Sequence, residues 1–380
     1  IAPGLGHQAQ FAVEVGNIDA DFTLAFVVQS HRGALQGNDG NAGVRALAAF
    51  GQCRVATKCQ AGQAPLAGFN QLAVDVELVD AIGFAAKQAG EGVRGFEIGD
   101  VEDAHVHRRQ GQQGLLALGG GCVLDTCKCV GNLLTNPGKA ENYQGWELVK
   151  NPAPYKIAVP TLSGTGSETS RTGIICNEEK NIKLGMNSDF TMFDQVLMDP
   201  DLTASVPRNQ YFYTGIDTYM HCFESITGSY RNVVVDSLAE KAIDLSKQVY
   251  LSSDMMSDEN REKLMIASFL GGMAAGFVCV VHPLSAGLSM VLHMHHGIAN
   301  CYALSVLEDI YPDEYKDFMV MMERQGIDLP KGICQGLTDA QYDALYGASI
   351  VHEKPLSNRL GPDFKKILTK ENVIERFLRM

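Results

Sequence analysis

Residues 115–125 read LLALGGGCVLD, a short apolar run that ends in three glycines and continues into a helical pattern. The run predicts a strand, and the pattern after it predicts a helix through Leu134, before Asn136-Pro137-Gly138 breaks it. A second strand is predicted at 155–160 (YKIAVP), and it leads into the glycine-rich loop 161–166. Two strand–glycine junctions so close together favour a parallel α/β sheet.

The pattern changes after about Val206, where long helical segments begin. We expect helices at 210–227, 232–251, 260–277, 299–310, 315–326, 338–348 and 363–380. The chain is therefore predicted to have an α/β N-terminal domain (1–205) and an all-α C-terminal domain (206–380).

Residues 1–113 differ from the rest in composition. All 12 Tyr, all 14 Met and the single Trp come after residue 113, and the earlier part is rich in Ala, Gly and Gln. A strand is predicted at 22–28, and a strand leading into a helix at 72–88. These signals cannot be ordered into βαβ units.

Composition excludes several classes of protein. With 46% hydrophobic and 20% charged residues the chain is not disordered, and a net charge of −13 argues against a nucleic-acid partner. The uncharged stretch 264–281 is expected to be a buried core helix, not a membrane span. No secretory leader is evident, and the ten cysteines lack repeated paired C-x-x-C spacing, so we expect reduced thiols in a cytoplasmic protein.

The two glycine loops, 119–125 and 161–167, have the chemistry of phosphate binding. Glycines let a backbone approach a phosphate closely, and a helix N-terminus offers oriented N–H donors. Neither loop is the G-x-G-x-x-G fingerprint, so a pyrophosphate cradle and a pair of tight turns both remain possible.

Acidic and imidazole side chains suggest a metal site. Asp217 and His221 are four residues apart on a predicted helix and share one face. Four further histidines follow: His282, His293, His295 and His296. One carboxylate with three imidazoles suits Fe²⁺ or Zn²⁺, whereas the alternative is a surface pair and an exposed histidine cluster. The isolated His352 is expected to pack or to form a hydrogen bond.

Taken together, these segments resemble the iron-containing (group III) alcohol dehydrogenase family. The resemblance covers residues 114–380 and rests on four segments in order: GGGCVLDTCK (119–128), VPTLSGTGSETS (159–170), GIDTYMHCFES (215–225) and HPLSAGLSMVLHMHHGIAN (282–300). It implies a Rossmann-like nucleotide-binding domain followed by an all-α domain, the dehydroquinate synthase-like architecture, with a metal in the cleft between them.

The resemblance also implies roles for individual residues. The metal ligands would be Asp217, His221, His282 and His296. The cofactor, NAD or NADP, would be contacted by Gly120, Gly121, Cys122, Asp125, Thr161, Leu162, Ser163 and Lys183, the last in a candidate hairpin at 180–186.

Two departures from the family pattern affect function. Cys122 replaces the usual serine and removes a strong hydroxyl donor. Ala286 stands where many members carry a histidine near the nicotinamide, so His293, His295 or water would have to replace that proton relay.

The activity implied is oxidation of a primary alcohol of a small polyol or sugar acid, or the reverse aldehyde reduction. It would use Fe²⁺ or Zn²⁺ and a nicotinamide, in a homodimer with no nucleic-acid or membrane partner. The run HPLSAGL, with 193–202 and 212–225, resembles the subgroup that includes the 3-deoxy-manno-octulosonate 8-oxidases, which act on a lipopolysaccharide sugar acid. Two alternatives are a sugar-acid oxidase that passes electrons to oxygen and a non-catalytic protein with a defective cofactor site.

The first 113 residues carry no motif for the adenosine side of the cofactor. Asp19, Asp21 and Asp39 are candidates for the ribose contact by location alone. The segment could be a strongly diverged nucleotide-binding half, a fragment, or a frame-shifted stretch. We favour the third, because composition and resemblance change at the same place.

Overall fold

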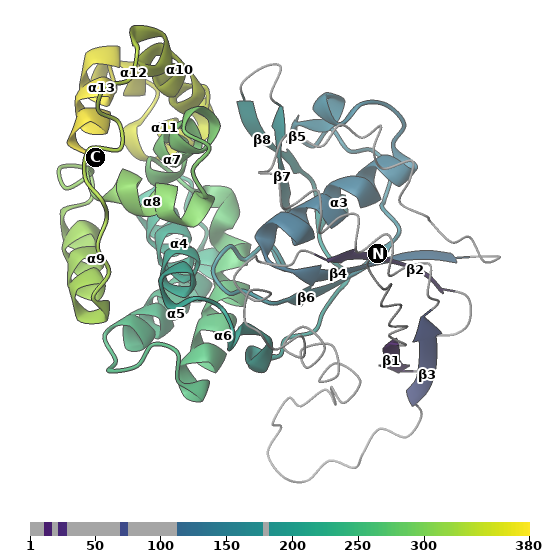
Figure 1. Cartoon of the computed structure of the whole chain (residues 1–380). Helices are drawn as coiled ribbons and strands as arrows, with labels where there is room; N and C mark the ends of the chain where they lie inside the picture. Colours follow the sequence, from purple (N-terminus) through teal and green to yellow (C-terminus); the bar gives the residue numbers. More distant parts are fainter. Residues whose placement is uncertain (1–10, 17–21, 29–68, 75–111, 178–181) are drawn as a thin grey trace, which may run out of the picture.

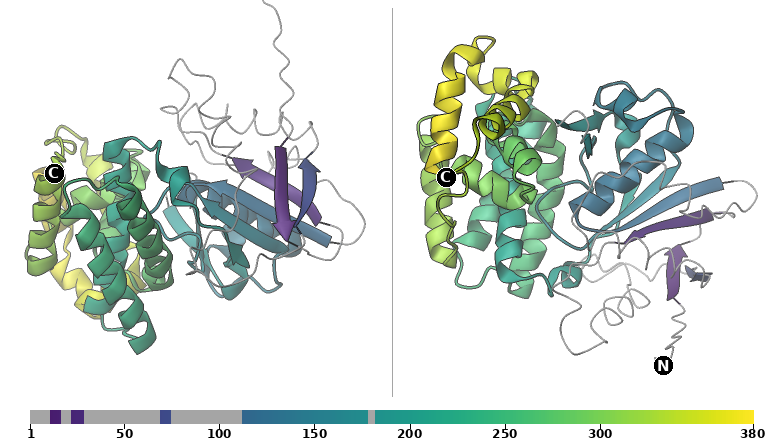
Figure 2. Two further views of the ribbon diagram at one scale, coloured as in Figure 1. Left: turned by 90° about the horizontal axis from the view of Figure 1, so that it is seen from below. Right: turned by 45° about the horizontal axis from the view of Figure 1, so that its top comes forward.

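The computed structural model describes residues 11–16, 22–28, 69–74, 112–177 and 182–380, with backbone alone in the first three ranges. An α/β region and a helical region lie side by side (Figures 1 and 2). The helix expected after residue 74 and the three candidate ribose contacts, Asp19, Asp21 and Asp39, lie outside the described residues.

The main sheet has four parallel strands in the order β2-β4-β6-β9. They are β2 (Phe22–Val28), β4 (Gln112–Gly119), β6 (Tyr155–Pro160) and β9 (Gln195–Val196). The strands predicted at 22–28, 115–118 and 155–160 are confirmed, as is their parallel arrangement. In the register, Leu118 of β4 lies opposite Val159 of β6, so the two glycine loops leave neighbouring strands at the same edge.

Alternating side chains of β4 supply a core to each face of this sheet. Leu115 and Ala117 pack with Val123 and Leu124 of α3 (Gly121–Thr135), whereas Leu116 packs on the opposite face. The predicted helix after the glycines is therefore confirmed, and it begins directly at the end of β4 (Figure 1).

A smaller sheet has the order β5-β8-β7, with β5 (Gly145–Trp146), β8 (Ile182–Asn187) and β7 (Thr172–Asn177). The hairpin strand predicted at 180–186 corresponds to β8, which pairs antiparallel with β7. A separate antiparallel pair joins β1 (Phe11–Gly16) to β3 (Phe69–Val74). Short 3₁₀ turns occupy Ala140–Tyr143, Asp189–Thr191 and Pro200–Thr203.

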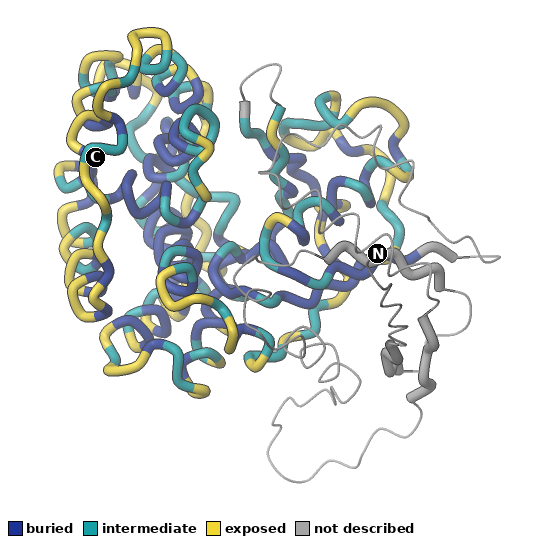
Figure 3. The backbone as a smooth tube through the Cα atoms, viewed as in Figure 1, coloured by how far each residue is buried: buried dark blue, intermediate teal, exposed yellow. Residues whose placement is uncertain are grey.

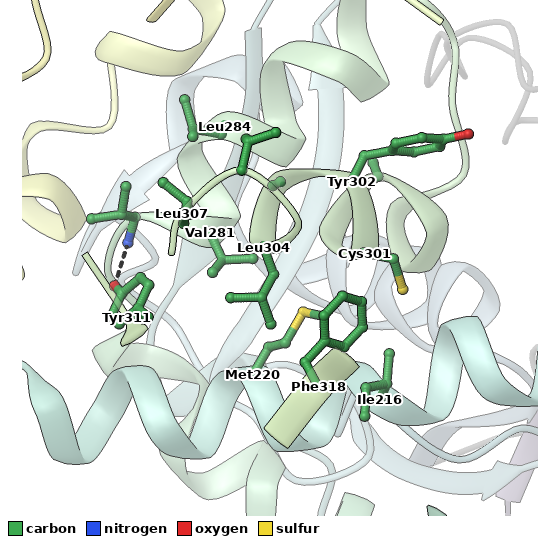
Figure 4. Close-up of a cluster of buried hydrophobic side chains, with 14 of the residues drawn as sticks. Ile216, Met220, Val281, Leu284, Cys301, Tyr302, Leu304, Leu307, Tyr311 and Phe318 are labelled. Atoms are coloured by element: carbon green, nitrogen blue, oxygen red, sulfur yellow. Dashed lines mark hydrogen bonds between the residues drawn. The ribbon is translucent and has the colours of Figure 1, made fainter. Parts of the chain in front are cut away.

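The helical region is built around α4 (Arg208–Thr227), most of which is buried (Figure 3). The other helices are α5 (Val233–Tyr250), α6 (Asp258–Ala274), α7 (Val281–Val291), α8 (His296–Leu304), α9 (Pro312–Gln325), α10 (Asp339–Ile350), α11 (Glu353–Leu360), α12 (Phe364–Ile367) and α13 (Lys370–Arg379). Figure 4 shows their shared apolar core, where Met220 of α4 lies among Val281, Leu304 and Phe318. This core fixes the helices that carry the candidate metal site.

Three helix predictions were wrong in extent. The stretch 264–281 is not one helix, because α6 ends at Ala274, a 3₁₀ turn follows, and α7 leaves at an angle of 93° to the preceding helix. The helix expected at 363–380 is divided into α12 and α13, where Thr369 caps the second by accepting from the Asn372 N–H. The helix expected at 299–310 runs instead from His296 to Leu304, and α7 and α11 were not predicted.

Within the described ranges, no single helix has the length and apolar character to cross a membrane; only the bent pair Asp258–Phe277 and Val281–Val291 passes that test jointly.

Candidate metal centre and nucleotide loops

One face of α4 carries the acidic part of the candidate metal centre. Asp217, His221 and Glu224 follow one another at spacings of four and three residues, so they share that face. Asp217 and Glu224 are both fully buried, and His221 is 6% exposed. Buried carboxylates are costly unless they are paired or bind a cation.

Two further histidines reach Asp217 from other helices. His282 lies in the first turn of α7, and His296 is the first residue of α8. From Asp217 oxygens, the distances to Nε2 are 3.2 Å for His282, 3.6 Å for His221 and 3.6 Å for His296. One ligand atom from each of the four residues lies within 4.8 Å of every other.

The expected alternative of an exposed histidine cluster does not apply to these residues. The His221 and His282 rings stack with centroids 4.5 Å apart in the interior. His293 and His295 are exposed and do not belong to the group of four. The structure therefore brings together the four residues that the family resemblance selected, and leaves their neighbours outside.

Glu224 fixes the orientation of His282. Its Oε2 accepts a hydrogen bond from His282 Nδ1 at 2.6 Å, and its Oε1 accepts from Tyr311 Oη at 2.8 Å. Oε1 also accepts the N–H groups of Val280 and Val281 at 2.5 and 2.8 Å. These backbone donors belong to the start of α7, so a carboxylate of α4 sets where α7 begins.

This hydrogen bonding leaves an arrangement that suits a cation. With its Nδ1–H given to Glu224, a neutral His282 presents the lone pair of Nε2 to Asp217 Oδ1. Two acceptors 3.2 Å apart repel each other unless a proton or a metal ion lies between them. Asp217 Oδ2 is also buried without a hydrogen-bond partner among the described residues. The donor set of three nitrogens and one carboxylate matches Fe²⁺ or Zn²⁺.

Without a metal ion, the electrostatics of the chain favour a proton on His282 in the space between the two acceptors. Burial would raise the pKa of Asp217, but His221 and His296 hold it well below its usual range. Burial lowers the pKa of His221 to about 4, so its ring is neutral at pH 7. Burial also tends to lower the pKa of His282, but the hydrogen bonds that its ring donates to Asp217 and Glu224 outweigh burial and raise the pKa to about 9.

Asn300 is a further polar group at the centre. Its Nδ2 donates to Asp217 Oδ1 at 2.6 Å, and it lies four residues after His296 on α8. Sequence reasoning missed both Asn300 and Glu224. Helical spacing could have found them, because each lies on the same helix face as a predicted ligand.

The glycine loops lie next to each other at the end of the main sheet. The Thr161 N–H donates to the Gly119 carbonyl at 3.0 Å, and a Cβ added at Gly121 would lie 2.7 Å from Thr165 Oγ1. Gly120 is the N-cap residue of α3 and forms no side-chain cap, so the N–H groups of Gly121 and Cys122 open the helix. A helix N-terminus beside a second loop at a parallel sheet edge is typical of a phosphate site.

The second loop is anchored on α4. Gly164 has φ +136°, and a Cβ there would lie 1.8 Å from the Thr214 carbonyl oxygen. The Thr218 hydroxyl donates to the Gly164 carbonyl at 2.8 Å, one residue after Asp217. Leu162 is buried, as is the hydroxyl of Ser163, which has no hydrogen-bond partner among the described residues. Metal centre and nucleotide loop are thus linked through α4.

Asp125 connects the two loop motifs. Its Oδ1 accepts the Ser167 hydroxyl at 2.6 Å and lies 3.6 Å from Lys128 Nζ. Lys183 of β8 acts electrostatically on Cys122 and Asp125 of the first loop and on His296 of the metal centre. Among the predicted cofactor residues, Asp125 is thus joined to the second loop through Ser167, and Thr161 is joined to Gly119 through a backbone hydrogen bond.

Two models of one family match this chain. The iron-containing alcohol dehydrogenase model covers residues 99–200, and the Fe-containing alcohol dehydrogenase C-terminal model covers residues 211–332, together more than half of the chain. The chain belongs to the iron-containing alcohol dehydrogenase family. The match starts at residue 99, which is 15 residues before the start expected at residue 114, so that expectation was wrong.

The chain is similar to curated proteins with enzyme names over about half of its length. Sulfoacetaldehyde reductase of Bilophila wadsworthia is 32% identical over 191 residues, 49% of each chain, and alcohol dehydrogenase 4 of Saccharomyces cerevisiae is 30% identical over 208 residues, 54% of each. The chain thus spans about half the length of these curated relatives. A 1,3-propanediol oxidoreductase structure has the same fold, with a TM-score of 0.64 and 23% identity, covering 78% of this chain and 88% of that one.

Proposed function

We propose that the protein is a metal-dependent oxidoreductase that interconverts a primary alcohol and its aldehyde with a nicotinamide cofactor. The observation that carries the proposal is the group of Asp217, His221, His282 and His296, whose ligand atoms lie within 4.8 Å of one another, with Asp217 and His221 buried. Membership of the iron-containing alcohol dehydrogenase family supports the same reaction class.

The four residues would hold Fe²⁺ or Zn²⁺. When bound, such an ion supplies Lewis-acid stabilisation of the substrate oxygen. The chain contributes the fixed geometry. Glu224 keeps His282 in one tautomer by accepting its Nδ1–H, and the Asn300 amide orients Asp217 by donating a hydrogen bond to Asp217 Oδ1. Burial excludes bulk water from the carboxylate, which strengthens its interaction with a cation.

The nicotinamide cofactor, NAD or NADP, would lie across the two loops. The backbone at Gly120, Gly121 and Cys122 would receive its pyrophosphate, which makes the replacement of serine by Cys122 tolerable. The rest of the cofactor would be contacted by Thr161, Leu162, Ser163 and Lys183. Asp125 would act indirectly, because its carboxylate already binds Ser167 and Lys128.

For the substrate we propose a small polyol or a sugar acid, the class to which the 3-deoxy-manno-octulosonate 8-oxidase subgroup belongs. We also propose a cytoplasmic homodimer with domains at 1–205 and 206–380. Light scattering after gel filtration measures the assembly state directly.

Two other functions are separated from this one by simple assays. An oxidase that passes electrons to oxygen would turn over without nicotinamide and stop under anaerobic conditions. A non-catalytic member of the family would bind neither NAD⁺ nor NADP⁺ in a titration. The proposed dehydrogenase reduces nicotinamide under anaerobic conditions.

The direct test compares His282→Ala with Ser289→Ala, a change on the same helix at a buried hydroxyl that has no hydrogen-bond partner in the described structure. The proposal expects H282A to lose both bound metal and turnover, and S289A to keep both. Full metal content and activity in H282A would contradict the ligand set.

A further inference from the structure

The segment that joins α10 to α11 is held close to the metal-site helix α7. A Cβ added at Gly287 of α7 would lie 2.4 Å from Ser349 Oγ and 2.8 Å from the Leu345 carbonyl of α10. Helix α10 therefore packs on α7 without space for a side chain between them. His352 follows only three residues after Ser349, as the residue before α11.

The same segment also contacts the small sheet of the α/β region. Lys354 Nζ lies 3.4 Å from the ring centroid of Trp146, which belongs to β5. Strand β5 pairs with β8, the strand of Lys183. Figure 1 shows α7 and α11 on the side of the helical region that faces β5 and β8. Residues 352–354 thus bridge the two regions next to the proposed active site.

One ring nitrogen of His352 has no hydrogen-bond partner among the described residues. Its Nε2 is buried and makes no hydrogen bond to any described residue. The ring interacts electrostatically with His282 of the metal centre and with Lys183 of the nucleotide side. A buried polar atom without a partner destabilises the fold, so a partner beyond the described residues is expected.

The position one turn after His282 on α7 provides no polar side chain for that purpose. Ala286 lies one turn after His282 on the same face, and its methyl group cannot bind a substrate oxygen. His293 and His295, expected from the sequence to replace the missing family histidine, are exposed. Burial, with the positive charges of Lys183 and His282, lowers the pKa of His352 to about 4, so its neutral ring has both a donor and an acceptor nitrogen at pH 7.

We propose that His352 is a substrate-contacting residue whose Nε2 hydrogen-bonds to a second oxygen of the substrate, beside the metal centre. The substrate class is then a primary alcohol or aldehyde that carries another hydroxyl or a carboxylate, which the nearby Lys183 also favours, and not a plain alkyl alcohol. This inference rests on the proposed function and adds the residue that selects among substrates.

The test uses two variants. His352→Leu has a side chain of similar volume without a hydrogen-bonding atom, and His352→Gln has an amide that restores a polar atom near the position of Nε2. Val351→Ala, at an exposed neighbouring position, is the control. For each protein, kcat and KM are measured with 1-propanol and with 1,3-propanediol and glycerol. Metal content and NADH affinity are measured in parallel, and calorimetric titration of both polyols gives a readout that does not depend on turnover.

We expect H352L to lose at least about tenfold in kcat/KM for the polyols, mainly through KM, and less than about twofold for 1-propanol. H352Q should recover most of the loss, and metal content and NADH affinity should not change. Equal losses for both classes of alcohol, or none for either, would overturn the role of His352. If no alcohol is turned over by the unaltered protein, the proposed function fails, and the calorimetric comparison still decides whether His352 binds polyols.

Discussion

Replacing Glu224 with glutamine tests how the chain prepares His282 for a metal. The carboxylate accepts four hydrogen bonds, three at Oε1 and one, from His282 Nδ1, at Oε2. A glutamine keeps one acceptor oxygen and gains an NH₂ group. Because the Val280 and Val281 N–H groups and the Tyr311 hydroxyl require the oxygen, the NH₂ group must face His282.

The expected consequence is a change of tautomer. His282 Nδ1 would then accept a hydrogen bond, and the ring proton would move to Nε2, 3.2 Å from Asp217 Oδ1. That nitrogen would bind the carboxylate and no longer offer a lone pair to a metal. Loss of such supporting contacts typically weakens metal binding by about 10- to 100-fold, or about 1.4–2.8 kcal/mol.

The assay is competition for Zn²⁺ against a chelator of known affinity, with metal content measured after dialysis. Ser225→Ala is the matched control, because its hydroxyl is buried on the same helix without a hydrogen-bond partner in the described structure. We expect E224Q to bind Zn²⁺ at least about tenfold more weakly than S225A. Equal affinities would refute the argument that Glu224 sets the tautomer.

Three further predictions concern stability. Gly164→Ala should lower the free energy of unfolding by roughly 3 kcal/mol, because the added Cβ would meet the Thr214 carbonyl. The control Gly336→Ala also has a positive φ but lies in open space, so it should lower the free energy of unfolding by only about 1 kcal/mol. Urea denaturation measures both values, and equal losses would refute the steric argument. Hydrogen bonds from Arg376 lower the pKa of Asp309, so their stabilisation is present above the unfolded value of about 3.9 and is lost as pH falls through the lowered folded value. Asp309→Asn should therefore flatten the acid side of the melting-temperature profile, and an unchanged profile would contradict this. Adding Zn²⁺ to chelator-treated protein at 100 times its dissociation constant should stabilise it by about 2.7 kcal/mol, and no rise in melting temperature would count against a metal site.

Elements with strong local signals were predictable from the sequence. The strand and helix around the glycines at 119–121 and the strand 155–160 combine apolar runs with clear breaks, and α4 follows a long helical pattern. Strand β2 was also found, although nothing in residues 1–113 indicated how it pairs.

Elements defined by tertiary contacts were not predictable. The start of α7 depends on Glu224, a carboxylate more than fifty residues away, so an uncharged run looked like a continuous helix. The four ligand residues could be chosen by family resemblance, but their burial and mutual distances required the fold. His352 carried no spacing signal, because its neighbours, Lys183 and His282, come from distant parts of the chain.

The central claim is that Asp217, His221, His282 and His296 hold one divalent metal ion. X-ray absorption spectroscopy of the zinc-loaded protein measures the ligands and their distances directly. The account predicts one ion per chain with three nitrogens and a carboxylate oxygen at about 2.0–2.2 Å, and its loss in Asp217→Ala. A sulfur ligand, or a metal retained in full by D217A, would contradict it.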